Sequence, residues 1–568
     1  MIELVFIAAM VDGASVQRSA PLPQPSVREA SGSELARPRS VPFATQRTDK
    51  GRRVRPLADG ESPPVDRFRV EFPLEAATLL DPSARSGRMV LFLKALDNQG
   101  VEDPADGPFF NDLQPVASTE VDSLAPGMTV EFGPDAIWWP EGAARLLEGE
   151  YEVQGVFDSD VTGPGHLAAG DLVSAPLVVD FNRARVDEAT VILTKGIEPL
   201  APPDGRSITD ISVESALLSA AAGKRVHHEA SVVFPRDYGN LNARRRHWPT
   251  IYEIAAPGRR AARAREIAVS LTDGVLGGLT PQAVYVILEG ESPLGPHAFV
   301  DSAANGPRGT ALVAELIPYL EDRFRLVREA GARVVAGHGT GGWAAIWLAL
   351  EHPKVLSAAF ASAPDPVDFS AFATSNLYKD ENLFVGADGS TRPAFRQVIG
   401  PTHDLVPMLV ADEVGVDHAI SPTGKSAGRF DAWAASYSPI DPATNAPRSL
   451  CDPQTGAIDP VAVEAWSAYD IVRRIRRDPA TLGLAFATRI HILMGARDSF
   501  YYNLAALSLR DTLDACARDV ASVGESLPDG PGYVEIVPGA THDSILPLAR
   551  LRFAREIREH FRAGRFHE

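Results

Sequence analysis

The stretch Arg333–Trp343, RVVAGHGTGGW, decides the fold of the larger, C-terminal part of this chain. An apolar run typical of a buried strand leads into a glycine-rich turn, and an apolar helix follows. Two functional motifs share this context. Gly337, Gly339 and Gly342 match the dinucleotide-binding fingerprint G-x-G-x-x-G without a violation. Gly337 and Gly341 also match the nucleophile elbow G-x-S-x-G, with Gly339 where the serine should stand.

Strand and helix patterns alternate on both sides of this motif, which predicts a mostly parallel, doubly wound α/β sheet over residues 206–568. The stretch 367–484 lacks this rhythm and is predicted to be an insertion or lid. The predicted strands are Ile211–Leu218, Val226–Phe234, Thr250–Ile254, Ala283–Leu288, Arg333–Ala336, Leu356–Ala361, Ile490–Met494 and Tyr533–Val537.

The two motifs make different demands on the rest of the chain. A dinucleotide site needs an acidic residue about 20 residues on, and Asp365 stands at the end of the next strand. A nucleophile elbow needs an acid and then a histidine, each just after a later strand. Asp498 follows the strand Ile490–Met494, and His542 follows Tyr533–Val537. Order and context together favour the hydrolase interpretation.

These segments resemble the putative-esterase branch of the α/β-hydrolases, the group with enterochelin esterase, feruloyl esterases and S-formylglutathione hydrolase. The resemblance rests on His297–Ser302 (HAFVDS), Glu315–Tyr319 (ELIPY), the elbow GHGTGGWAA and Ala363–Phe369 (APDPVDF). It implies a small-molecule ester or related ligand, no cofactor and no metal.

The resemblance also implies the roles of individual residues. It makes Asp498 the acid, His542 the base, and the N–H groups of Thr340 and Ala256 the oxyanion donors. Pro257, next to Ala256, has no N–H to offer.

Gly339 departs from the family pattern at the nucleophile, since glycine carries no attacking oxygen. In subtilisin, loss of the serine costs about 2 × 10⁶ in kcat. We therefore expect carboxylic-ester hydrolysis to be absent or severely impaired and the protein to bind a ligand as a degenerate relative of the enzymes. One alternative is an active esterase in which water or another hydroxyl replaces the serine, or whose given sequence carries an altered residue at position 339. The other is a nucleotide-binding oxidoreductase that uses the glycine fingerprint.

The N-terminal third has a different organisation. The apolar residues 2–11 lie within a predicted signal-like segment, residues 1–18, and favour export to the periplasm or beyond over a cytoplasmic location. Residues 19–65 are rich in Pro, Arg and Ser and are predicted to be a disordered linker. Short β-type runs over residues 66–199 predict an all-β sandwich. It resembles a domain found ahead of the esterase in some secreted bacterial members.

Composition limits the remaining classes of function. A chain of 568 residues with 45% hydrophobic and 23% charged residues is globular and holds more than one domain. Its net charge of −19 disfavours nucleic acid as a partner. There is no apolar stretch long enough to span a membrane. Cys451 and Cys516 allow at most one disulfide and lack the spacing of a metal site.

Overall fold

The computed structural model describes residues 68–566, apart from 82–83, 97–101, 108, 134, 141–148, 160–166, 168–169, 182–188, 198–206, 274–277 and 523–529. The predicted signal-like segment 1–18 and linker 19–65 lie outside the described residues, so both stay predictions. In the described part of the chain, no helix combines the length and the apolar content that a membrane crossing requires.

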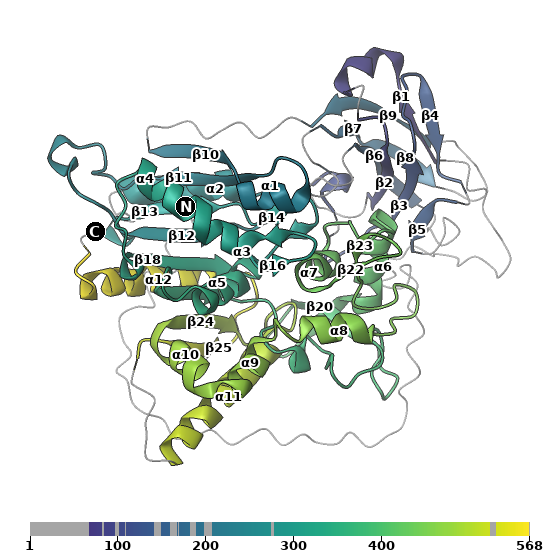
Figure 1. The fold of residues 1–568 in the computed structure, drawn as a ribbon. Coiled ribbons are helices and arrows are strands. Elements are labelled where there is room, and N and C mark those ends of the chain that lie inside the picture. The colour runs from purple at the N-terminus through teal and green to yellow at the C-terminus, as the bar shows by residue number, and fades with distance from the viewer. Residues whose placement is uncertain are drawn as a thin grey trace. The chain divides into compact units, whose positions relative to one another are not determined.

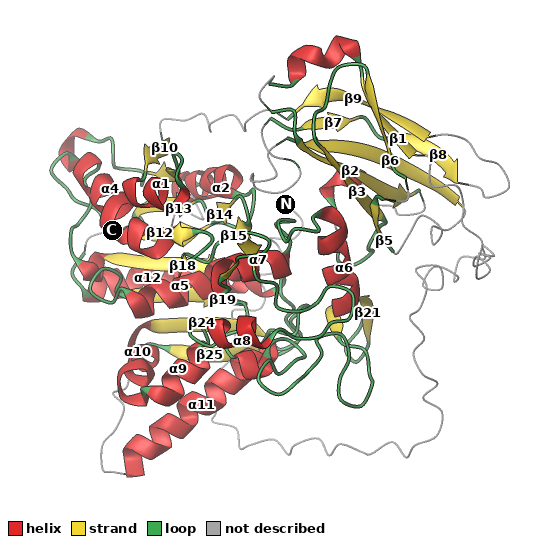
Figure 2. Cartoon of the chain, turned by 45° about the vertical axis from the view of Figure 1, so that its right-hand side comes forward, coloured by secondary structure: helices red, strands yellow, loops and turns green. Residues whose placement is uncertain are grey.

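The described residues before position 197 form a nine-stranded sheet with little helix (Figure 2). The hydrogen-bonded path runs β4-β1-β9-β7-β6-β2-β3-β5, and β8 pairs with β6. One core cluster joins Met89 and Leu91 of β2 to Phe68 and Val70 of β1, so the sheet folds over on itself. Its strands are β1 Phe68–Phe72, β2 Gly87–Ala95, β3 Val116–Val121, β4 Met128–Glu131, β5 Ile137–Trp139, β6 Gly149–Asp158, β7 Leu172–Ser174, β8 Leu177–Phe181 and β9 Ala189–Gly196.

The second sheet has eight strands in the order β10-β11-β13-β12-β18-β19-β24-β25 (Figure 1). The pairs β10–β11 and β11–β13 are antiparallel, and all later pairs are parallel, which confirms the predicted α/β class. The strands are β10 Ile208–Glu214, β11 His227–Val233, β12 Thr250–Ile254, β13 Val284–Leu288, β18 Arg333–His338, β19 Ala358–Ser362, β24 Ile490–Gly495 and β25 Tyr533–Val537.

One predicted strand is partly wrong. The range Ile211–Leu218 is divided between β10, which ends at Glu214, and helix α1, Ala216–Ala222. Ser215 ends the strand because its side chain accepts a hydrogen bond from the N–H of Leu218 and caps the helix. A short apolar run fits a strand or a helix equally well, and the cap decides between them.

The central strands are buried on both faces, as parallel strands covered by helices must be. Helix α5, Thr340–Glu351, is apolar almost all round, and nine of its twelve residues are buried. Helix α12, Ile545–Ala563, buries one stripe that includes Phe553, whose ring packs on Phe360 of β19. The other helices beside the sheet are α2 Arg260–Thr272, α3 Arg308–Ala311, α4 Ile317–Arg323 and α11 Asn503–Ser522.

The segment between β19 and β24 adds no strand to this sheet. It holds a hairpin and several helices, and its core is an aromatic cluster of Phe369, Phe372, Trp433, Tyr437 and Trp466. Its elements are β20 Pro393–Val398, β21 Asp404–Leu409, α6 Val410–Ile420, α7 Arg429–Tyr437, β22 Ile440–Asp441, β23 Ala446–Pro447, α8 Pro460–Trp466, α9 Ile471–Arg477 and α10 Leu484–Arg489. Cys451 and Cys516 are both buried and do not form a disulfide.

Candidate functional site

The turn between β18 and α5 has the sharp backbone of an elbow. Gly339 at its apex has φ +56° and ψ −125°, a conformation that side-chain-bearing residues rarely adopt. A Cβ on Gly337 would lie 2.2 Å from the carbonyl oxygen of Gly341, and one on Gly341 would lie 2.9 Å from that of Ile254. A Cβ on Gly342 would lie 3.0 Å from the carbonyl oxygen of Ser362. The backbone conformation and close packing thus account for all four glycines, and no bound nucleotide is needed to explain them.

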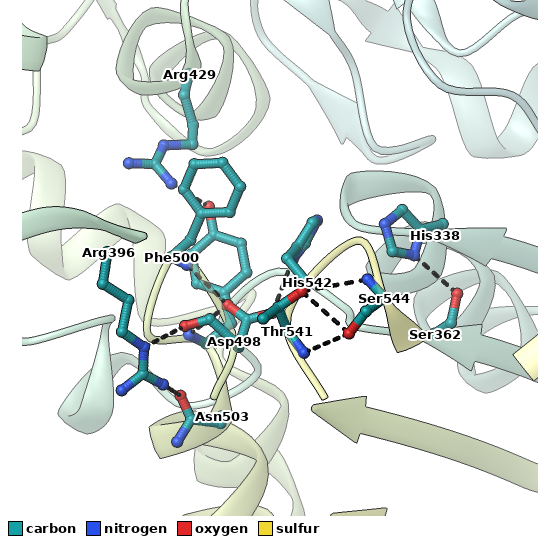
Figure 3. A network of polar contacts seen from close by, with 11 residues as sticks. His338, Ser362, Arg396, Arg429, Asp498, Phe500, Asn503, Thr541, His542 and Ser544 are labelled. Atoms are coloured by element: carbon teal, nitrogen blue, oxygen red, sulfur yellow. Dashed lines mark hydrogen bonds and ion pairs between the residues drawn. The ribbon is translucent and has the colours of Figure 1, made fainter. Parts of the chain in front are cut away.

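Asp498 and His542 meet at the edge of the sheet where the parallel strands β24 and β25 end. His542 Nδ1 lies 2.7 Å from Asp498 Oδ2 (Figure 3). The other carboxylate oxygen of Asp498, Oδ1, accepts hydrogen bonds from the N–H groups of Phe500 and Tyr502, at 3.0 and 3.1 Å. Asp498 is fully buried, and three donors therefore fix its orientation.

The contact with Asp498 determines the direction in which the pKa of His542 is shifted. Burial alone lowers the pKa of an imidazole, but the hydrogen bond and the negative charge of Asp498 raise it more, so that the pKa of His542 lies above its ordinary value. His338 packs 4.6 Å from His542, ring centre to ring centre. Burial and the charge of His542 lower the pKa of His338 to about 3, so His338 stays neutral. It contacts the hydroxyl of Ser362 at 2.9 Å, and this accords with a packing role.

His542 faces the apex of the elbow. Its Nε2 lies 3.6 Å from the position that a Cβ on Gly339 would occupy. A serine Cβ–Oγ bond of about 1.4 Å and a hydrogen bond of about 2.8 Å, joined at a near-tetrahedral angle, place Cβ about 3.5 Å from the acceptor nitrogen. A serine hydroxyl at position 339 would therefore lie at hydrogen-bonding distance from His542.

Asp365 lies beside the same apex, in the turn after β19. Its Oδ2 accepts hydrogen bonds from Thr340 Oγ1 at 2.7 Å and Trp433 Nε1 at 2.9 Å. Its Oδ1 lies 4.0 Å from the Cβ position at Gly339. Burial raises the pKa of Asp365, and the hydrogen bonds from Trp433 and Thr340 oppose that shift. The sequence suggested Asp365 only as a ribose-binding acid, although a carboxylate at the end of a strand beside the elbow could have been proposed for the hydrolase site.

The two oxyanion donors predicted from the resemblance, the N–H groups of Thr340 and Ala256, lie in different surroundings. Thr340 is the first residue of α5, so its N–H has no partner within the helix and is free to bind an oxyanion. Its hydroxyl is committed to Asp365 and cannot serve as a nucleophile directed at His542. Ala256 lies in the exposed loop after β12, where its carbonyl oxygen accepts the N–H of Arg259. Its role as a donor stays a prediction.

Two arginines of the insertion hold the loop that carries Asp498, and neither had a signal in the sequence. Arg396 donates through Nε to the carbonyl oxygen of Asp498 at 2.8 Å and through Nη2 to Asn503 Oδ1 at 3.1 Å. Arg429 stacks on the ring of Phe500, 4.5 Å from its centre, and donates to the Tyr502 hydroxyl at 2.7 Å. Both arginines appear around this loop in Figure 3.

The adjacent residues His227 and His228 differ in their surroundings. His228 is buried and contacts Glu315, whereas its neighbour His227 is exposed on the other side of β11. Over the ranges that the structure describes, no three His, Cys, Asp or Glu side chains are grouped so that they could hold a metal ion.

Comparison with known proteins relates this geometry to a family. Residues 308–515, which include the elbow and Asp498, match the family model described as "Putative esterase". No curated protein matches the chain. Among solved structures, it is similar to a ferulic acid esterase, at 11% identity and a TM-score of 0.36, over 62% of this chain and 98% of that one.

Two further solved structures share the likeness. An S-formylglutathione hydrolase from Agrobacterium tumefaciens has 13% identity and a TM-score of 0.35, over 65% of this chain and 99% of that one. A ferulic acid esterase from Anaeromyces mucronatus has 12% identity and a TM-score of 0.29, over 64% and 93%. The match to the "Putative esterase" model over residues 308–515 and the mostly parallel second sheet agree with the esterase branch of the α/β-hydrolases.

Proposed function

We propose that this protein is a degenerate member of the esterase branch that binds a small carboxylic ester or a related ligand but lacks serine-dependent ester hydrolysis. One observation carries the proposal. His542 Nε2 faces the Cβ position of Gly339 at 3.6 Å, with the bond to Asp498 intact, so the base is in place and the nucleophile is not.

The nucleophile of such a site contributes most of its rate acceleration. Loss of the serine in subtilisin lowers kcat by about 2 × 10⁶, which corresponds to roughly 8–9 kcal/mol of transition-state stabilisation. A histidine–aspartate pair and oxyanion donors without a nucleophile leave a residual acceleration of about 10³–10⁴ over water. The nucleophile therefore outweighs the groups that the site retains.

The test adds the missing hydroxyl. We expect Gly339→Ser to raise kcat/KM for p-nitrophenyl acetate and butyrate by about 10³-fold or more. The nearest atom to the new Cβ lies at an ordinary contact distance, so the serine fits without moving His542. Gly339→Ala is the matched control, because it adds the Cβ without the oxygen and should gain no activity.

Two results would contradict the proposal. One is strong hydrolysis by the unsubstituted protein at a rate that Gly339→Ser does not exceed. The other is equal activity of the serine and alanine variants, which would show that the hydroxyl is not what the site lacks.

A further inference from the structure

The carboxylate of Asp365 is held in one orientation beside the elbow. It is only 4% exposed, and its backbone N–H donates to the carbonyl oxygen of Gly339 at 3.3 Å. The hydroxyl of Thr340 and the indole N–H of Trp433 both donate to the same oxygen, Oδ2. Because two donors from different elements fix Oδ2, the direction of Oδ1 is fixed as well.

Oδ1 of Asp365 lies near the position that a side chain on residue 339 would occupy. Among the described residues it has no hydrogen-bond partner, and it lies 4.0 Å from the Cβ position at Gly339. His542 Nε2 lies 3.6 Å from the same point. A carboxylate oxygen and a neutral imidazole nitrogen are both acceptors, so the ligand that satisfies both is a small molecule with two O–H donors. Water has this chemistry.

We propose that Asp365 and His542 together hold a water molecule at the position of the missing serine hydroxyl, and that this water attacks a bound carboxylic ester directly. The inference rests on the proposed function, because a serine at position 339 would displace the water. It assigns Asp365 a catalytic role that a serine nucleophile would make unnecessary.

The step balances with the residues present. The water oxygen bonds to the ester carbonyl carbon while one of its protons passes to His542 Nε2 and the other stays hydrogen-bonded to Asp365 Oδ1. The Thr340 N–H stabilises the oxyanion. As the carbon–oxygen bond to the alcohol breaks, His542 gives its proton to the leaving alkoxide. Ester and water thus give carboxylic acid and alcohol, and no acyl-enzyme forms.

The substitution Asp365→Asn tests the role with little change of shape. The amide oxygen of asparagine can accept the bonds from Thr340 and Trp433, and its NH₂ group then replaces Oδ1, the carboxylate oxygen near the Cβ position at Gly339. We expect this change to lower the residual hydrolysis of p-nitrophenyl acetate about 100-fold, which is the order of a positioned acid–base group. His542→Ala supplies the baseline, and the unsubstituted protein should exceed it without a burst of p-nitrophenol.

The same substitution in the Gly339→Ser background separates catalysis from folding. In that background the serine hydroxyl attacks the ester. Asp365→Asn should therefore lower the rate of hydrolysis less than about 10-fold, well below the effect of a positioned acid–base group. An equal loss in both backgrounds would show that Asp365 only supports the fold, and it would overturn the inference. So would a rate of the unsubstituted protein equal to that of His542→Ala, or full residual activity of Asp365→Asn.

The proposed function fails by a different result. If Gly339→Ser is no faster than the unsubstituted protein, the missing serine is not what limits the site. The behaviour of Asp365→Asn in the unsubstituted background does not decide that question.

Discussion

A side chain at position 339 should destabilise the protein, and the size of this effect measures the strain in the elbow. The perturbation is Gly339→Ala. Gly339 has φ +56° and ψ −125°, and holding a side-chain-bearing residue in such a conformation costs about 1–3 kcal/mol. Sterics add nothing, since the nearest atom to the new Cβ, His542 Nε2, lies 3.6 Å away.

A smaller effect acts in the opposite direction. Alanine restricts the unfolded chain more than glycine does, which favours folding by about 0.4–1 kcal/mol. The net loss is then about 1.5 kcal/mol. For a unit as large as residues 206–568, whose unfolding entropy is about 2 cal/mol/K per residue, this lowers the melting temperature by about 2 °C.

Calorimetry with two further glycines as controls makes this small shift interpretable. Gly389 has φ +78° and open space around its Cβ position, so Gly389→Ala should lower the free energy of unfolding by a comparable amount through backbone strain alone. Gly239 also has open space but no positive φ, so Gly239→Ala should leave the melting temperature unchanged or raise it slightly. A melting temperature of Gly339→Ala that changes no more than that of Gly239→Ala would show that the elbow is not strained. Gly339→Ser should be more stable than Gly339→Ala by about 1 kcal/mol, because its hydroxyl gains a hydrogen bond to His542.

Two further predictions concern the groups around His542. Its raised folded-state pKa means that it contributes stability that is fully present below its unfolded value near 6.5 and is lost as the pH rises through the folded value. The pKa of His542 is raised by three carboxylates, those of Asp498, Asp543 and Asp365, so Asp498→Asn should lower it. An NMR titration that follows the imidazole proton signal of His542 measures this pKa. An unchanged midpoint would contradict the prediction. Arg396→Gln removes the bonds that hold the carbonyl of Asp498 and the side chain of Asn503. Hydrogen exchange of the N–H groups of Phe500 and Tyr502 should then quicken about tenfold, whereas exchange in β12 serves as the unaffected reference.

Much of the sheet could be predicted because its central strands are short apolar runs bounded by turn residues. Thr250–Ile254 and Tyr533–Val537 have the predicted bounds, and other strands differ by one or two residues. The predicted strand Ile211–Leu218 was wrong beyond Glu214, because the side chain of Ser215 caps a helix there. A hydrophobic pattern does not encode such a cap. The order of Asp498 and His542 after their strands was enough to predict that they lie together, since parallel strands end at one edge.

The parts contributed by the insertion could not be predicted. Trp433, Arg396 and Arg429 lie far from the motif in sequence, and each reaches the site through tertiary contacts only. Nothing in the residue types around them distinguishes a tryptophan that binds a carboxylate from one that fills a core. Asp365 was visible at the end of its strand, but only the structure shows that one of its oxygens is hydrogen-bonded and that the other lies near the apex of the elbow.

Retention of the histidine–aspartate pair does not by itself argue for catalysis. Asp498 accepts bonds from His542, Phe500 and Tyr502 and therefore organises its own loop, so folding alone is sufficient reason to keep it. Asp365 Oδ1 is different, because among the described residues nothing donates to it. Although Asp365 is only 4% exposed, its Oδ1 is not among the enclosed side-chain atoms that lack a partner, so it is open to a water molecule or a ligand hydroxyl. A bound water or ligand hydroxyl would donate to this oxygen, so this atom, more than the intact pair, is where a site that still acts on a ligand would differ from an inactive remnant.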